Sequence, residues 1–234
     1  MAASFNPGGT RVVSAGAHCT VRLWRLEGNG EPSILSGHED SVLAASLSPD
    51  GTLVVSAGDD GTVRLWRVDG TGEPSIFSGY ERWVSAASFS PDGRLVVSAG
   101  DDGMVRLWHA DGTGEPLILG GHQGGVLTAS FSPDGRQVVS AGRDGAVRLW
   151  HADGSGEPLI LGGHEGRVDA VSFSPDGTLL VSAGTDGTVR LWHVFASERK
   201  LIEAARASLS RQLTDPQRAK YHLPPRASEH RAQS

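Results

Sequence analysis

Five of the six tryptophans of this chain stand a constant 42 residues apart, and this period constrains the fold more than any other feature. The best-preserved copy of the repeated stretch is residues 56–66, which read Ser-Ala-Gly-Asp-Asp-Gly-Thr-Val-Arg-Leu-Trp. A fixed period of this length is typical of repeat architectures, in which each unit packs against its neighbours and none folds alone. We therefore expect residues 1–194 to form one array of five units, at about 2–36, 37–78, 79–120, 121–162 and 163–194.

Each unit contains four short runs that favour strands, separated by residues that favour turns. In the second unit the first turn is Pro49-Asp50-Gly51, and the runs cover residues 42–48, 52–57, 62–68 and 75–77. Glycine in such a turn supplies the positive φ that other residues avoid. Four antiparallel strands per repeat make one blade of a β-propeller. The predicted fold class is therefore all-β, a β-propeller of five four-stranded blades.

Three further motifs recur at the same spacing: a Gly-His pair before the first strand, a Ser-x-x-x-Asp-Gly turn, and the tryptophan of the third strand. The pair stands at Gly37-His38, Gly121-His122 and Gly163-His164. On these motifs the chain resembles the WD-repeat (WD40) β-propeller family over about residues 2–194. Its Phe-Ser-Pro-Asp-Gly and Val-Arg-Leu-Trp phrases are similar to those in the C-terminal repeat region of bacterial WD-repeat signalling proteins.

The first unit and the end of the chain depart from the family pattern. The first unit lacks the Gly-His pair and has His18-Cys19 in place of Asp-Gly, and no fourth strand is apparent for the fifth unit. We therefore expect the first and last blades to be incomplete and the ring to be open. After Val194, apolar residues recur at helical spacing, which predicts an α-helical tail over residues 195–223 and a disordered end over 224–234.

Serine, histidine and aspartate recur together with the tryptophan, and the family resemblance implies that they form structural tetrads. Hydrogen bonds would run from the loop before the first strand to the indole of the third strand, because these side chains offer matching donors and acceptors. A catalytic serine needs an exposed hydroxyl, an oxyanion site and a pocket, and repetition of the set argues against one active site. The expected tetrad residues are His38, Ser56, Asp60 and Trp66; Ser98, Asp102 and Trp108; His122, Ser140, Asp144 and Trp150; and His164, Ser182, Asp186 and Trp192.

The near-identical copies differ mainly in two regions. Residues 79–120 and 121–162 differ at 10 of 42 positions, and most of these lie around the loop before the first strand or at the turn between the second and third strands. A binding function carried by loops on a rigid frame would vary at such positions. The resemblance implies that both regions open on the partner-binding face, so the candidate partner-binding residues are Tyr80, Arg82, Trp83, Asp59, Asp101, Arg143 and Arg167.

Trp83 allows two interpretations. Its counterparts in the other units are Ser41, Gly125 and Arg167, which tolerate solvent, and an indole beside Arg82 has the composition of a binding hot spot. Alternatively, Trp83 folds into the blade to compensate for the histidine that the third unit lacks at position 80. The sequence leaves both interpretations open.

Charge and composition exclude several classes of function. Residues 1–194 carry 13 Lys and Arg against 23 Asp and Glu, a net charge of −10, which does not suit nucleic-acid binding. No apolar run approaches the length of about 18 residues that a membrane span needs, and no signal peptide is apparent. The single cysteine, Cys19, fits a cytoplasmic location. No metal-binding or cofactor-binding motif is present, so we predict no cofactor and no metal.

These observations predict a non-enzymatic scaffold or sensing module that binds a protein or peptide on the loop face of the propeller. A propeller-frame enzyme, such as a hydrolase or lyase, is the alternative from another class. A third hypothesis is a truncated fragment of a longer propeller-containing signalling protein, which would self-associate through its open blades.

Overall fold

The computed structural model describes residues 2–28 and 30–194, which form strands β1 to β19 and, within these ranges, no helix. The all-β prediction is confirmed for this part of the chain. The predicted helical tail (195–223) and disordered end (224–234) lie outside the described residues. Among the described residues there is no helix long and apolar enough to span a membrane.

The strands form five antiparallel sheets, here called the first to fifth blades. The first contains β1 (Ala2–Phe5), β2 (Arg11–Ala15), β3 (Thr20–Arg25) and β4 (Ser33–Ser36), and the second β5 (Val42–Leu47), β6 (Leu53–Gly58), β7 (Val63–Arg67) and β8 (Ser75–Phe77). The third contains β9 (Val84–Phe89), β10 (Leu95–Gly100), β11 (Met104–His109) and β12 (Leu117–Gly121). The fourth contains β13 (Val126–Phe131), β14 (Gln137–Gly142), β15 (Val147–His151) and β16 (Leu159–Leu161), and the fifth β17 (Val168–Phe173), β18 (Leu179–Gly184) and β19 (Val189–His193).

In every blade, strands that follow one another in sequence are neighbours in the sheet. Short turns make this possible, as at Gly51, whose φ of 71° only glycine adopts without strain. The Oγ of Ser48 accepts a hydrogen bond from the amide of Leu53 at 2.9 Å and donates one to Asp50 at 2.6 Å, which closes the turn between β5 and β6. The same Ser-Pro-Asp-Gly sequence makes the corresponding turn in the later blades.

The prediction that the first blade is incomplete is wrong. β1 pairs with β2 from Ala2 opposite Ala15 to Phe5 opposite Val12, so the sheet has four strands. Strand pairing needs only backbone N–H and C=O groups, and the missing motif residues belong to loops. The irregularity is confined to the turn where Cys19 replaces glycine, and this residue has a φ of 57°. The fifth blade has three strands among the described residues, in agreement with the prediction for the last blade.

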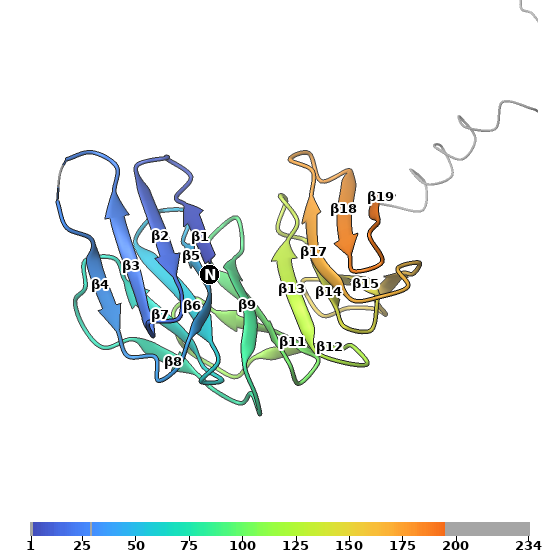
Figure 1. Ribbon diagram of the computed structural model, residues 1–234, viewed down its shortest axis with the longest axis horizontal. Helices are drawn as coiled ribbons and strands as arrows, with labels where there is room; N and C mark the ends of the chain where they lie inside the picture. The colour runs from blue at the N-terminus through green and yellow to red at the C-terminus, as the bar shows by residue number, and fades with distance from the viewer. Residues whose placement is uncertain (1, 29, 195–234) are drawn as a thin grey trace, which may run out of the picture. The chain divides into compact units, whose positions relative to one another are not determined.

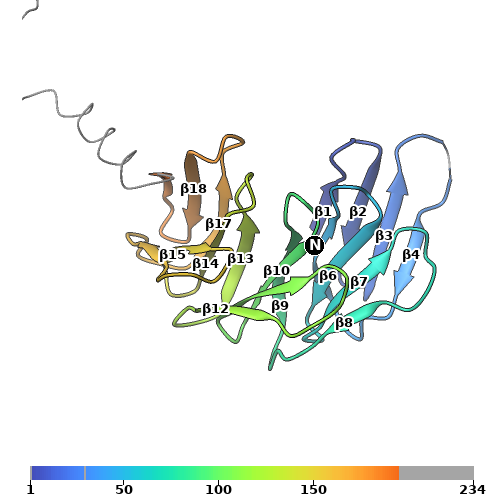
Figure 2. The ribbon, with the colours of Figure 1, turned by 180° about the vertical axis from the view of Figure 1, so that it is seen from behind.

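The hydrophobic core lies between the blades. One layer joins Val63 and Leu65 of the second blade to Val96 and Trp108 of the third, and equivalent layers join each of the other successive pairs. The innermost strands β1, β5, β9, β13 and β17 contact one another in this order. Figures 1 and 2 show the result, an open array in which the first and fifth blades are at opposite ends. The prediction of an open five-bladed propeller is confirmed.

Candidate functional site

The predicted tetrad of the second blade is connected by hydrogen bonds. Trp66 Nε1 donates to Ser56 Oγ at 2.8 Å, and Ser56 Oγ lies 2.7 Å from His38 Nε2. His38 Nδ1 lies 2.8 Å from Asp60 Oδ2. A neutral histidine that donates from Nδ1 and accepts at Nε2 completes this chain with every donor facing an acceptor. The tetrad therefore joins the loop before β5 to strands β6 and β7.

The fourth and fifth blades repeat this geometry. His122 Nε2 lies 2.8 Å from Ser140 Oγ, and His164 Nε2 lies at the same distance from Ser182 Oγ. The tryptophan of each blade donates to the same serine, at 2.8 Å and 2.9 Å. Each histidine also faces the aspartate of its own blade, Asp144 or Asp186, through Nδ1.

Electrostatics keep these groups in fixed protonation states. Burial lowers the pKa of His38 and His122 below the ordinary value of 6.5 and outweighs the opposite effect of the facing carboxylates. Burial alone would raise the pKa of Asp60 and Asp144, but the hydrogen bonds that these carboxylates accept hold both pKa values below the usual range. At neutral pH, His38 and His122 are therefore neutral, and Asp60 and Asp144 are charged.

The serine hydroxyls of the tetrads are not available to a substrate. Ser56, Ser98 and Ser140 are completely buried, and Ser182 is nearly so. Each hydroxyl already accepts a hydrogen bond from an indole inside the sheet. A nucleophile needs an exposed oxygen beside a pocket, so the geometry favours a structural function for these residues over a catalytic one.

The third blade replaces the histidine with Tyr80, and the structure corrects our assignment of this residue to the partner-binding set. The hydroxyl of Tyr80 hydrogen-bonds to Ser98 Oγ and accepts from Trp108 Nε1 at 3.3 Å. The guanidinium of Arg106 lies 4.4 Å from the centre of the Tyr80 ring. The side chain of Tyr80 is longer than that of histidine, so its hydroxyl reaches Ser98 directly. In the other blades the ring nitrogen Nε2 of the histidine contacts the serine. Tyr80 is therefore part of the frame, and Trp83 is not needed to fill this place.

One arginine in each of the later four blades completes the polar network and was missed by sequence reasoning. Each lies four residues after the tetrad aspartate, and the distances from Nη to the carboxylate oxygen are 3.5, 2.6, 2.6 and 3.7 Å for Arg64, Arg106, Arg148 and Arg190. The available signal was the arginine in the repeated Val-Arg-Leu-Trp phrase, a charge between apolar strand residues. Such a position requires a buried partner.

Four of the seven partner-binding candidates gather where the third blade meets the fourth. We call Arg82, Trp83, Asp101 and Arg143 the loop cluster. Asp101 lies between the two arginines, 3.4 Å from Arg82 Nη1 and 3.8 Å from Arg143 Nη2. The guanidinium of Arg143 lies 5.6 Å from the centre of the Trp83 ring, within the range of a cation–π contact.

The loop cluster depends on a difference between two near-identical copies. Trp83 occupies the position that Gly125 occupies in the fourth unit. A Cβ atom at Gly125 would lie 2.7 Å from Asp101 Oδ1, so only glycine allows the third-blade aspartate to approach the fourth blade this closely. The carboxylate of Asp101 is almost buried, whereas Arg82 and Arg143 are about half-exposed or more. The cluster thus combines a half-buried indole and two exposed guanidinium groups with one almost buried carboxylate.

Asp59 and Arg167 are not brought into the loop cluster. Asp59 is exposed in the turn between β6 and β7, and Arg167 pairs with Asp169 at 2.7 Å in the fifth blade. The turn that contains Asp59 does reach the loop before β9, because a Cβ at Gly61 would lie 3.1 Å from the carbonyl oxygen of Arg82. The two variable regions are therefore adjacent in space, on one side of the propeller, and Asp59 lies on that side.

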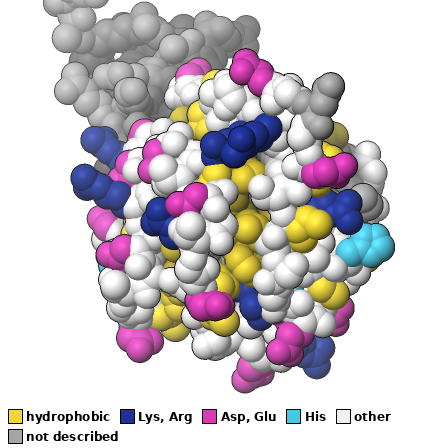
Figure 3. Space-filling model, turned by 90° about the vertical axis from the view of Figure 1, so that its left-hand side faces the viewer, with side chains coloured by type: hydrophobic (Ala, Val, Ile, Leu, Met, Phe, Trp, Pro, Cys, Tyr) yellow, Lys and Arg dark blue, Asp and Glu magenta, His cyan; other side chains and the backbone are white. Residues whose placement is uncertain are grey.

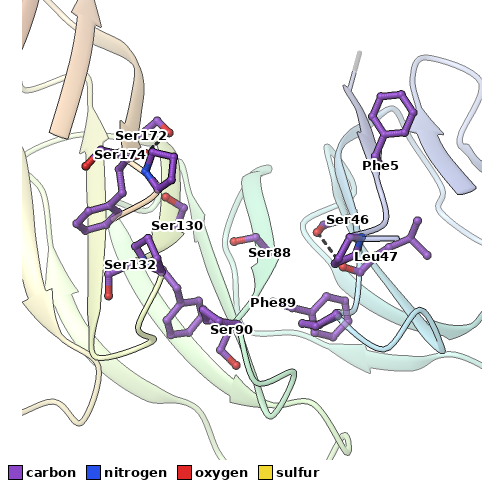
Figure 4. Close-up of a pocket in the computed structure, with 17 residues that line it drawn as sticks. Phe5, Ser46, Leu47, Ser88, Phe89, Ser90, Ser130, Ser132, Ser172 and Ser174 are labelled. Atoms are coloured by element: carbon purple, nitrogen blue, oxygen red, sulfur yellow. Dashed lines mark hydrogen bonds between the residues drawn. The ribbon is translucent and has the colours of Figure 1, made fainter. Parts of the chain in front are cut away.

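A central cavity of about 430 Å³ is lined by residues of all five blades. Figure 4 shows Phe5 at one end, Ser172 and Ser174 at the other, and the side chain of Ser88 between them. The described residues that line it are serine, proline, phenylalanine and leucine. None of these has a side chain that titrates near neutral pH, so the cavity offers no general acid or base. Within the part of the chain that the structure describes, no group of three or more His, Cys, Asp or Glu side chains could hold a metal ion.

Comparison with known proteins agrees with the geometry. The family model described as WD domain, G-beta repeat matches residues 1–25, 31–67, 73–109, 115–151 and 157–193. From the second match onward, each begins shortly before the outer strand of one blade and ends with the third strand of the next, so the sequence repeat joins two neighbouring sheets. No curated protein shows significant similarity. With five matches that together cover most of its length, the chain belongs to the WD-repeat (WD40) family.

Proposed function

We propose that this protein is a non-enzymatic interaction scaffold that binds a protein or peptide through the loop cluster. WD40 domains generally mediate protein–protein interactions, and the repeats and blades of this chain suggest a scaffold of that kind. The observation that carries the finer proposal is the contact of Arg143 from the fourth blade with Trp83 from the third, where these two copies differ most in sequence.

The chemistry of the loop cluster indicates what its partner presents. Tryptophan and arginine are the residues most enriched in binding hot spots. Asp101 neutralises only one of the two guanidinium groups, so one positive charge remains on the surface of a body that is otherwise acidic. A partner segment with a carboxylate side chain for the arginines and an apolar side chain for the indole would fit this arrangement. We therefore propose an acidic, partly apolar protein segment as the ligand.

Selection of peptides from a random phage-displayed library on the intact protein tests this proposal. We expect the enriched peptides to contain Asp or Glu beside an aromatic or aliphatic residue. Their binding should fall by about tenfold or more with Trp83→Ser, since the loss of one hot-spot side chain costs about 2 kcal/mol. Arg143→Ala should also weaken binding of these peptides. Neither substitution should lower the melting temperature appreciably, because Arg143 is half-exposed and Trp83, although half-buried, belongs to none of the hydrophobic layers between the blades.

Arg167→Ala provides the matched control. Arg167 occupies in the fifth unit the position that Trp83 occupies in the third, but it is exposed and lies outside the loop cluster. Peptide binding should be unchanged by this substitution. Equal losses for Arg167→Ala and Trp83→Ser would disprove the assignment of the site, as would a large fall in melting temperature for Trp83→Ser with binding retained.

A further inference from the structure

Each internal interface is formed by the forward face of one blade, which is the face toward the next blade in the chain, and the backward face of that next blade. The residues of these faces are similar from one interface to the next. The forward face of the second blade presents Val63 and Leu65, and the backward face of the third blade presents Phe89 and Trp108 to it. The interface between the third and fourth blades repeats this arrangement with Val105 and Leu107 against Phe131 and Trp150. All of these residues are buried. A forward face and a backward face are thus complementary wherever they meet in this chain.

The described residues leave the forward face of the fifth blade uncovered. Val189 and Leu191 are 70% and 71% exposed, whereas the equivalent Val147 and Leu149 of the fourth blade are 0% and 6% exposed. Val181, in the neighbouring strand β18, is also exposed, although its equivalents in the second, third and fourth blades are fully buried. The residue types are unchanged, and the difference is that no described residues pack against this face.

The backward face of the first blade is uncovered in the same way. Phe5 is 67% exposed, and the equivalent Phe131 of the fourth blade is 8% exposed. Trp24 is exposed as well, although the tryptophans of the second, third and fourth blades are buried. Figure 3 views the molecule from the side on which the first blade lies in Figure 1, and it shows hydrophobic side chains exposed between acidic and basic ones. Exposed apolar surface of this kind marks an interaction site.

We propose that the forward face of the fifth blade of one copy packs against the backward face of the first blade of a second copy. The occupant is a second copy because one chain carries both halves of an interface that it already forms four times internally. The Val-Leu pair and the Phe-Trp pair that meet inside the molecule are the pairs that the described residues leave uncovered in the fifth and first blades. Such a head-to-tail contact joins different surfaces of two identical molecules, and therefore leads to a closed ring or to a filament.

This contact uses surfaces distinct from the loop cluster, so it does not depend on the proposed function. The two end faces belong to β1–β3 and β18–β19, whereas the loop cluster lies in the loops of the third and fourth blades. Association would leave Trp83 and Arg143 of each copy accessible and would place several copies of the binding site in one assembly. Multivalent binding to a repetitive partner would then be stronger than binding by one copy.

Two half-blocked variants of the full chain test the proposal. Leu191→Glu blocks the forward face and leaves the backward face intact, and Phe5→Glu does the reverse. Both positions are highly exposed, so the charge does not enter the core of the described blades. Ile160→Glu is the matched control, because Ile160 is an equally apolar, exposed residue on the outer strand β16 and belongs to neither end face.

Sedimentation velocity over a concentration series gives the readout. We expect the mass of the wild type and of Ile160→Glu to rise with concentration above that of the 24.5-kDa chain, and each half-blocked variant alone to remain monomeric. An equimolar mixture of Phe5→Glu and Leu191→Glu should form a dimer and nothing larger, since one functional face of each variant can meet the other. This dimer also shows that both variants are folded.

Three outcomes overturn the proposal. A wild-type chain that is monomeric at every concentration shows that no second copy occupies these faces. Continued self-association of either half-blocked variant shows that the contact is not head-to-tail. A mixture that stays monomeric shows that the two intact faces do not recognise each other.

Discussion

Removal of the tetrad carboxylate in the fourth blade, by Asp144→Ala, separates the structural from the catalytic interpretation of the Ser, His and Asp residues. Asp144 accepts hydrogen bonds from His122 Nδ1 at 2.9 Å and from the amide of Gln123 at 3.0 Å, and it pairs with Arg148 Nη1 at 2.6 Å. Its side chain is almost buried, as is that of Arg148. The substitution therefore leaves a buried guanidinium and a buried imidazole without their shared acceptor.

The size of the effect follows from these contacts. Loss of one member of a buried ion pair costs about 3–5 kcal/mol, and we take the lower end because the edge of the Arg148 guanidinium reaches solvent. A loss of about 3 kcal/mol lowers the melting temperature of a chain of this length by about 6–12 °C. Thermal unfolding followed by circular dichroism at neutral pH measures this shift. Asp153→Ala, which removes an exposed turn carboxylate in the same blade, should leave the melting temperature nearly unchanged.

Two results would refute this reasoning. The first is a melting temperature for Asp144→Ala equal to that of Asp153→Ala, which would show that the buried network contributes nothing to stability. The second is a hydrolase or lyase activity of the wild type that disappears in Asp144→Ala while the melting temperature stays the same. The first result contradicts the structural interpretation, and the second supports the enzyme alternative.

Two further predictions concern stability. Because the pKa values of His38 and His122 are lowered from 6.5 by burial, the unfolded chain binds protons that the folded chain does not, so stability should fall as the pH drops below about 6.5. Urea unfolding at a series of pH values measures this loss, and it should be smaller in His122→Tyr, which has the residue that the third blade uses; an identical pH dependence would contradict the assignment. Cys19→Gly should stabilise the chain by about 0.5–1 kcal/mol, because glycine adopts the φ of 57° without steric cost. Urea unfolding tests this as well, and a loss of stability would show that Cys19 is not strained.

Much of the fold could be predicted because the same sequence pattern occurs in five units. The 42-residue period, the turn glycines and the apolar runs recur with the same spacing, so an error in one unit is corrected by the others. The hydrogen-bonding partners of His38, Ser56 and Asp60 could be anticipated from the resemblance to the WD-repeat family, because these residues match its structural tetrad and offer matching donors and acceptors. The open ring was also predicted from the sequence, because no fourth strand is apparent there for the fifth unit.

The remaining features depend on which side chains meet across a blade interface, and a repeat pattern does not contain this information. The contact of Arg143 with Trp83 joins residues from two units whose differences were noticed separately. Tyr80 was misassigned because a substitution in a motif looks the same whether the new residue replaces the old one inside the blade or turns to solvent. The completeness of the first blade was missed because its loops lack the motif residues of the family, whereas its strand residues still allow β1 to pair with β2.

Hydrogen–deuterium exchange of the intact protein, with and without a selected peptide, tests most directly whether this propeller binds its partner through the loop cluster. We predict that the peptide slows exchange at residues 80–84 and at the turns that contain Asp101 and Arg143, and leaves exchange at the innermost strands around the central cavity unchanged. Protection confined to the strands that line the cavity, or to the outer strands β8, β12 and β16, would contradict the account.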